Sequence, residues 1–284
     1  SYKLETQNGQ QYMQTVIAYE EAKGTENINY EHPEEYLNSV VQENYLNGKE
    51  INGLDYIKQN APIQNYDLSV SGSSEKINYY LSVSTTDQKG IIYNDNFSRI
   101  SIRNNFEAEV HSWLKIGMNT SFTNRDYSGV EANLDQAYFM HPYADVEDDD
   151  GNLIRLIDGD GMNFNPLWNA KKQVNKQYNE NLFNLMYVKI DIPQIKGLSY
   201  QLNYSNTFRW GHNYFFNPID TRQGLNITGS GRKTESRNRD WILENIVKYE
   251  RDFSDKHHLD LTFLYSANES DYTTTTASSS NLIT

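Results

Sequence analysis

From residue 64 onward, apolar and polar residues alternate in long runs, and this period of two limits what the chain can fold into. Near residue 68, for example, Tyr66, Leu68 and Val70 alternate with Asp67 and Ser69. Such alternation is typical of a β-strand with one apolar and one polar face. About eight segments show it, over residues 65–73, 77–84, 99–108, 114–123, 181–192, 198–209, 241–250 and 259–268. The sequence therefore predicts an all-β chain.

The lengths of the strands and of their connections indicate which all-β fold this is. The alternating segments run for about 9 to 14 residues, close to the roughly 9–11 that a tilted strand needs to cross a bilayer. Short turns alternate with longer stretches at 87–96, 127–179 and 212–238. Outer-membrane barrels combine short periplasmic turns with long outer loops. We therefore expect an antiparallel transmembrane β-barrel whose loops 127–179 and 212–238 are extracellular.

The first part of the chain, residues 1–63, lacks this alternation. Apolar residues of the stretch Gln10–Lys23 follow helical spacing, and Gly24 is a suitable stop. A second helix is expected to begin at Pro33, a good first-turn residue, and to end at Asn47. We therefore expect a partly helical connecting segment before a barrel portion that covers 64–284.

Composition excludes several classes of protein. The net charge of −13 is unsuited to binding a nucleic-acid backbone, and the chain has no cysteine for a disulfide, thiol nucleophile or thiolate metal site. It carries 22 Tyr and 11 Phe, more aromatic residues than disordered chains have. Tyrosine suits sites that are apolar at one end and wet at the other. No nucleophile, zinc or phosphate-loop motif is present, so we expect neither enzyme activity nor a cofactor.

The stretch 64–97, QNYDLSVSGSSEKINYYLSVSTTDQKGIIYNDNF, resembles the start of the barrel in SusC-like (SusC/RagA family) TonB-dependent outer-membrane transporters. The resemblance continues through RISIRNNFEAEVHSWLKIGMNTSFT, Asn165-Pro166-Leu167, VKIDIPQIKGLSYQLNYS and NIVKYERDFSDKHHLDLTFLYS. It covers about Gln10 to Asn268 as a string of motifs in the family's order. Ser73 replaces a family glycine, and Asp55-Tyr56 stands where the family has Asp-Trp.

The resemblance implies an origin and a function for the chain. Family members close with roughly 22 strands, so that about 8 strands make up a fragment of the barrel. We expect this fragment to follow a plug domain, which is absent here and through which the TonB complex would act. The family location is the bacterial outer membrane, in contact with its lipid. The implied activity is uptake of oligosaccharides together with a SusD-like surface lipoprotein, with peptides as the alternative substrate.

Six residues are candidates for substrate contact. Arg99 and Arg103 lie on the polar face of one predicted strand and would point into the lumen, where they either guide a substrate or pair with acids such as Glu107. Aromatic rings stack on sugar rings, and the longest loop supplies four of them. These loop candidates are Tyr138, Phe139, Tyr143 and Trp168. Packing of the loop against itself or against a lid protein is the other interpretation of these rings.

An acidic run, EDDDGN over 147–152, and Asp158-Gly159-Asp160-Gly161 suggest a calcium site with Asp148 and Asp150 as ligands. The run does not fit the EF-hand template, because Val146 and Ile157 occupy the first and twelfth positions. Asp-Gly pairs are ordinary turn formers. We therefore expect acidic turns in an extracellular loop, with an irregular calcium site as the alternative.

Two rival hypotheses remain open from the sequence. One is a soluble β-rich surface domain whose long loops grip a ligand, and the other is a smaller passive outer-membrane barrel. A protein that stays soluble without detergent is the outcome that the first rival predicts. A gene without an upstream plug segment or a neighbouring SusD-like gene is what the second predicts.

Overall fold

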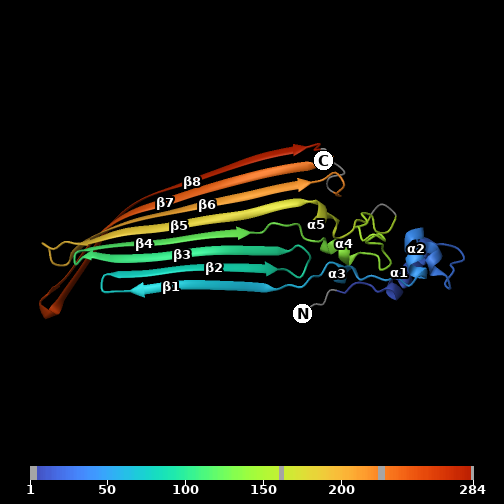
Figure 1. Ribbon diagram of the computed structural model, residues 1–284, viewed down its shortest axis with the longest axis horizontal. Coiled ribbons are helices and arrows are strands. Elements are labelled where there is room, and N and C mark those ends of the chain that lie inside the picture. The colour runs from blue at the N-terminus through green and yellow to red at the C-terminus, as the bar shows by residue number, and fades with distance from the viewer. Residues whose placement is uncertain (1–4, 160–162, 223–227, 283–284) are drawn as a thin grey trace.

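The computed structural model describes residues 5–159, 163–222 and 228–282, and its largest feature is one antiparallel sheet (Figure 1). The eight strands lie side by side in chain order, each hydrogen-bonded to the next. They are β1 Ile63–Ser73, β2 Ile77–Lys89, β3 Asn96–His111, β4 Leu114–Asp126, β5 Val174–Asp191, β6 Leu198–Asn217, β7 Ser230–Phe253 and β8 His257–Ser280. The predicted all-β antiparallel architecture is confirmed, in the form of an open sheet with β1 and β8 at its edges.

The connections lie at two different ends of the sheet. At one, here called the turn end, the connections are residues 74–76, 112–113, 192–197 and 254–256, the last forming the 3₁₀ turn η2 Ser254–Lys256. At the other, the loop end, they are residues 90–95, 127–173 and 218–229. Figure 1 shows the helices gathered beyond the loop end. Antiparallel pairing of successive strands produces this separation, because every second connection returns to the same end.

The register keeps side chains of one kind on one face across the sheet. Leu68 is paired with Val83, which is paired with Ile102, and the row continues through Phe122 and Leu182. A slip by one residue would move this row to the other face. We call the side that carries this row the apolar face and the other side the polar face. In an outer-membrane barrel the apolar face meets lipid and the polar face lines the lumen.

No helix in the described ranges is both long and apolar enough to span a membrane.

Polar residues that interrupt the apolar face bond to one another across the strands. Thr120 Oγ1 donates to Asn184 Oδ1 at 2.9 Å, and Asn184 Nδ2 donates to Asn206 Oδ1 at 3.0 Å. Asn245 Oδ1 accepts from the Tyr200 hydroxyl at 2.7 Å. A polar group in an apolar medium is costly unless it is hydrogen-bonded. Cross-strand pairing therefore makes these residues compatible with an otherwise apolar surface.

The later strands extend well past the stretches that alternate clearly in the sequence. β5 begins at Val174, β6 continues to Asn217, β7 begins at Ser230 and β8 continues to Ser280. The connections expected at 127–179 and 212–238 are accordingly shorter, 127–173 and 218–229. On β7 and β8 both faces carry polar residues near the loop end, so the period of two disappears while backbone pairing continues, whereas β6 keeps Trp210, Tyr214 and Phe216 on its apolar face. Hydropathy marks the apolar band of a barrel strand rather than its full length.

The connection expected to be long at 87–96 is a tight turn. β2 continues to Lys89 and β3 begins at Asn96, and the Gly90 amide donates to the Asp95 carbonyl at 2.6 Å. Asn94 has a φ of 65°, a conformation that asparagine tolerates better than most residues. A strict alternation of short turns and long loops is therefore wrong at this position.

The first predicted helix is present as α1, Gly9–Lys23. Asn8 and Gln11 form a capping box at its start, and Gly24 ends it with a φ of 80°. The second predicted helix is split into the 3₁₀ turn η1, Pro33–Tyr36, and the helix α2, Ser39–Leu46. Leu37 between them is extended.

The split has a local cause at Asn38. This residue lies in the extended region, and its side chain accepts from the Val41 amide at 3.1 Å, so it starts a new helix. The prediction of one continuous second helix is therefore wrong.

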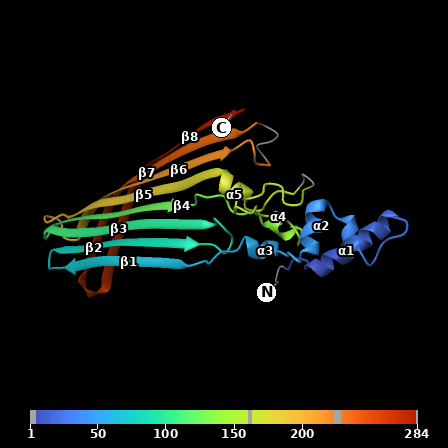
Figure 2. The same ribbon diagram turned by 45° about the vertical axis from the view of Figure 1, so that its right-hand side comes forward.

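The buried core lies beyond the loop end, where the N-terminal residues 5–62 pack against residues 127–159 and 163–173. We call these segments together the lobe (Figure 2). Three further short helices belong to it, α3 Gly53–Tyr56, α4 Leu134–Tyr138 and α5 Trp168–Lys172. Its main clusters join Ile57 to Ala137 and Leu167, and Met13 to Tyr143. The segment expected as a simple connector thus shares a core with the longest loop.

Candidate functional site

A hollow of about 770 Å³ lies in the polar face, toward the loop end, and strands β4 to β8 line it. Its size is within the range of small-molecule sites. Gly211 lies near its middle, in register with Asn179 on β5 and Ser236 on β7. A Cβ at Gly211 would approach Ser236 Oγ to 2.6 Å. The missing side chain therefore helps to keep this part of the wall open.

Arg209 lies one step along β6 on the same face and is held by an ion pair. Its Nη1 donates to Asp240 Oδ2 on β7 at 2.7 Å. Asp240 is fixed in turn by Ser270 on β8, whose hydroxyl donates to Asp240 Oδ1 at 2.5 Å. The guanidinium is about half exposed, 54% of its side chain, and has further donors for a ligand.

Two amides flank Arg209 in register, Asn181 on β5 and Asn238 on β7. The Oδ1 atom of each is buried and has no hydrogen-bond partner within the described residues. Buried polar atoms without a partner are rare in folded proteins. The hollow therefore combines a positioned cation, the amide side chains of Asn181 and Asn238, and the rings of Phe183 and Tyr272. This set can bind a ligand rich in hydroxyl or amide groups.

The structure brings both predicted arginines to this face, beside the hollow. Arg99 is in register with Arg125, and Arg103 is in register with Ser121; both of these β4 residues line the hollow. Arg99 Nη2 donates to Thr86 Oγ1 at 3.2 Å.

Glu107, the acid expected to pair with these arginines, has other partners. It accepts a hydrogen bond from the Tyr187 hydroxyl and forms an ion pair with Lys115 at 3.4 Å. Arg99 and Arg103 therefore stay candidates for guiding a substrate along the wall.

The four aromatic candidates lie in the lobe, away from the hollow. Tyr143 is buried, packs with Met13 and Val41, and is only 7% exposed. Burial raises its pKa, and the nearby Glu50 carboxylate raises it further. Packing within the lobe buries most of the Tyr143 ring.

Trp168, Tyr138 and Phe139 differ in exposure. Trp168 is half-buried, and its indole N–H donates to the Asp220 carbonyl at 3.0 Å, which ties the lobe to the β6–β7 connection. Tyr138 and Phe139 form an edge-to-face pair at 5.0 Å, and Phe139 is 78% exposed. These two rings are free for contact with a substrate or a partner protein.

The acidic stretch forms a turn closed by its own backbone. Asp148 Oδ1 accepts from the amides of Asp150 and Asn152 at 3.0 and 2.8 Å. The Asn152 contacts hold the Asp148 pKa below its usual value. Across the described ranges, no group of three acidic or histidine side chains is arranged to hold a metal. Asp160, also part of the calcium hypothesis, lies outside the described residues.

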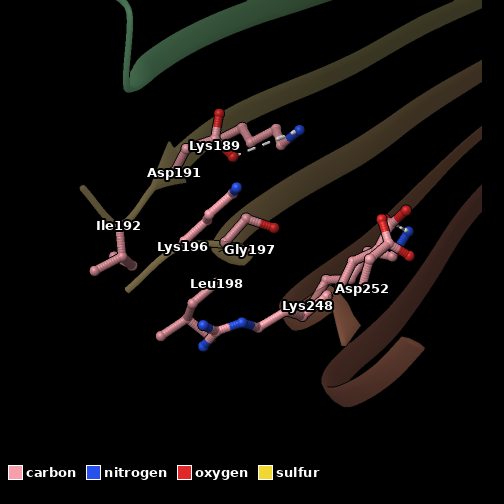
Figure 3. A pocket seen from close by; sticks show the side chains of 11 residues that line it. Lys189, Asp191, Ile192, Lys196, Gly197, Leu198, Lys248 and Asp252 are labelled. Carbon is pink, nitrogen blue, oxygen red and sulfur yellow. Dashed lines mark hydrogen bonds and ion pairs between the residues drawn. The ribbon is translucent and has the colours of Figure 1, made fainter. Parts of the chain in front are cut away.

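A second hollow, of about 560 Å³, lies at the turn end, between the β5–β6 turn and the end of β7 (Figure 3). Lys189 is paired with Asp191 at 3.8 Å, and Lys248 with Glu250 at 2.9 Å. Lys196 of the turn also lines it. Charges of both signs lie close together here, and Lys189 and Lys248 already have carboxylate partners. This hollow is therefore less suited to binding a ligand than the hollow around Gly211.

Sequence reasoning missed the residues that form the hollow on the polar face. The predicted strand ends at Arg209 and the predicted loop begins at residue 212, so Gly211 lies outside the predicted strand. One signal was present: a glycine within a strand marks a close approach or an open space. The register of β5, β6 and β7, which places Asn181, Arg209 and Asn238 together, is a property of the folded sheet.

Comparison with known proteins gives the following similarities. No family model matches the chain. It is 27% identical over 207 residues to TonB-dependent receptor P39 of Formosa agariphila. The aligned region covers 72% of this chain and 19% of that protein. It is 22% identical over 214 residues to TonB-dependent receptor P26 of the same organism, and this aligned region covers 70% of this chain and 20% of that protein. The chain thus spans about a fifth of the curated relatives it matches.

The fold matches structures of the RagAB peptide transporter. In one structure the TM-score is 0.77 at 20% identity, covering 98% of this chain and 34% of that chain. In the open-open state of the RagAB importer the TM-score is 0.75, again at 20% identity, covering 96% and 33%.

The sheet, its two faces and these matches define the chain as a segment of an outer-membrane β-barrel. The predicted resemblance to SusC/RagA-like TonB-dependent transporters is confirmed. The expected outer-membrane location agrees with it. The relatives are named as receptors and importers rather than as enzymes.

Proposed function

We propose that this chain forms part of the wall of a TonB-dependent importer that takes up oligosaccharides through the outer membrane. The observation that carries the proposal is the hollow around Gly211, in which amides, a guanidinium and aromatic rings line the lumenal face. Neutral hydroxyl-rich ligands match such a surface, because each hydroxyl both donates and accepts. Arg99 and Arg103 extend the same surface toward β3.

The proposal includes the parts that such an importer needs besides this wall. A plug domain would transmit force from the TonB complex, and residues 1–63 would connect it to the barrel. A SusD-like lipoprotein would cover the loop end, where the exposed pair Tyr138 and Phe139 offers it an aromatic contact. The acidic turn at Asp148 and Asp150 would then face the outside of the cell.

Peptide uptake is the second candidate function. The fold neighbours are structures of a peptide importer, and this favours it. Amide side chains, such as those of Asn181 and Asn238 that line the hollow, both donate and accept hydrogen bonds and so also match peptide groups.

Uptake by intact cells distinguishes the two substrates. Cells that carry the full-length gene and its neighbouring genes are given labelled neutral hexasaccharides or labelled hexapeptides. We expect energised uptake of a hexasaccharide that disappears when either this gene or tonB is deleted. Uptake of hexapeptides alone would establish the second candidate function. Uptake of both probes that is unchanged in the deletion strains contradicts the importer proposal.

A further inference from the structure

A groove of about 600 Å³ crosses the lobe between α1, the segment that leads into η1, and the end of α2. Six of its lining residues carry aromatic rings or hydrogen-bonding groups: Gln10, Gln14, Tyr30, Tyr45, Glu50 and Tyr143. None of the residues that line it also lines the hollow around Gly211. The groove is therefore a separate feature, located beyond the loop end of the sheet.

Three tyrosines from separate segments give the groove its aromatic surface. The rings of Tyr45 and Tyr143 lie 5.2 Å apart at 86°, and Tyr143 is buried, so its ring is a fixed part of the floor. Tyr30 is 64% exposed, and its hydroxyl donates to Glu21 Oε1 at 3.1 Å, which holds it at the rim. Positioned rings of this kind present flat apolar faces with hydroxyls at their edges.

The polar groups of the groove come from α1 and from Glu50. Gln10 and Gln14 are exposed and lie one turn apart on α1, so their amides are neighbours on one face of the helix. Glu50 Oε1 accepts from the Gly9 amide at 2.8 Å, which orients the carboxylate beside them. Lysine and arginine are not among the residues that line the groove. This surface offers donors and acceptors to hydroxyls but no cation to an anionic ligand.

We propose that this groove binds a neutral oligosaccharide, with the tyrosine rings against the sugar faces and Gln10, Gln14 and Glu50 hydrogen-bonded to hydroxyls. The inference deepens the proposed function and rests on it, because the groove meets substrate from outside the cell only if the loop end faces outward. A sugar held here would be captured before it reaches the hollow in the wall. A basic peptide is the other ligand that a carboxylate among tyrosines attracts, but two amides beside a single carboxylate favour the sugar.

Calorimetric titration of the full-length, detergent-purified protein with linear hexasaccharides of glucose, xylose and mannose tests the inference. We expect one of these probes to bind, and Tyr30→Ala to weaken that binding by about tenfold through loss of an aromatic contact. Tyr30→Phe keeps the ring and is expected to stay within about threefold of the parent. Tyr19→Ala is the matched control, because Tyr19 is also 64% exposed and does not line the groove.

Three results would overturn the inference: no binding of any hexasaccharide, equal affinity in the parent and Tyr30→Ala, or tighter binding of hexalysine than of the sugars. Cellular uptake is a separate readout. If cells show energised uptake but the affinity of the purified protein is the same with and without the Tyr30 ring, the proposed function stands and the groove is rejected as the sugar site. If the purified protein binds sugar through Tyr30 but cells show no energised uptake, the groove is supported as a sugar site and the importer proposal is contradicted.

Discussion

Replacing Ile57 by alanine is expected to destabilise the lobe by about 2–5 kcal/mol, the usual cost of removing a large buried aliphatic side chain. Ile57 is 0% exposed and belongs to the cluster that joins α3 to the longest loop through Leu54, Ala137 and Leu167. Its backbone carbonyl also accepts from the Tyr93 amide at 2.8 Å, so the backbone around it is fixed and cannot readily collapse into the cavity.

Hydrogen exchange followed by mass spectrometry measures this effect in the intact protein. Peptides from α3 and α4 should lose protection in Ile57→Ala, while peptides from the middle of β5 should keep theirs, because the sheet has its own backbone pairing. Ile91→Ala is the control: Ile91 is 62% exposed, so its loss should change stability by less than about 0.5 kcal/mol. Unchanged protection of α3 and α4 in Ile57→Ala would show that residues 5–62 and 127–173 do not share a core.

Filling the hollow on the polar face is expected to have the largest effect on transport. Gly211→Phe would project a ring into the space lined by Asn181, Arg209 and Asn238. A Cβ at this position meets mainly the side chain of Ser236, which can rotate, so the sheet itself should tolerate the change. We expect substrate affinity to fall by on the order of tenfold, which corresponds to about 1.4 kcal/mol.

Ser205→Phe is the matched control for Gly211→Phe. Ser205 lies on the same strand and the same face, nearer the turn end, and does not line the hollow. Titration with the transported oligomer should give the parent affinity for this variant. If both substitutions reduce affinity equally, the loss reflects a general narrowing of the lumen and the hollow is not the site.

The sequence predicted the sheet well wherever the apolar face is continuous. Leu68, Val70 and Val83 alternate with polar neighbours because one face of each strand meets lipid, and the strands lie at these positions. Helix α1 was equally readable, since its periodicity and the Gly24 stop are both local signals. These features depend on residues close together in the chain.

The full strand lengths and the buried contacts of the lobe could not be predicted from the sequence, because they depend on contacts between distant residues. β7 and β8 continue to Ser230 and Ser280 through polar residues that do not alternate with apolar ones, so hydropathy does not mark these parts of the strands. The burial of Tyr143 depends on Met13 and Val41, which lie far away in the sequence. The sequence leaves two interpretations of Tyr143 open, substrate contact and packing of the loop, and the structure places its ring, 7% exposed, at the floor of the groove in the lobe.

The central claim is that the apolar face meets lipid and the polar face meets the water of the lumen. Spin labels attached to single cysteines at positions 182–188 of β5 test it most directly, because this chain has no cysteine of its own to label. In bilayers, even-numbered positions such as Leu182 should collide with oxygen, which concentrates in lipid. Odd-numbered positions such as Phe183 should collide with a water-soluble nickel chelate. Accessibility to the nickel chelate at even and odd positions alike would contradict the account.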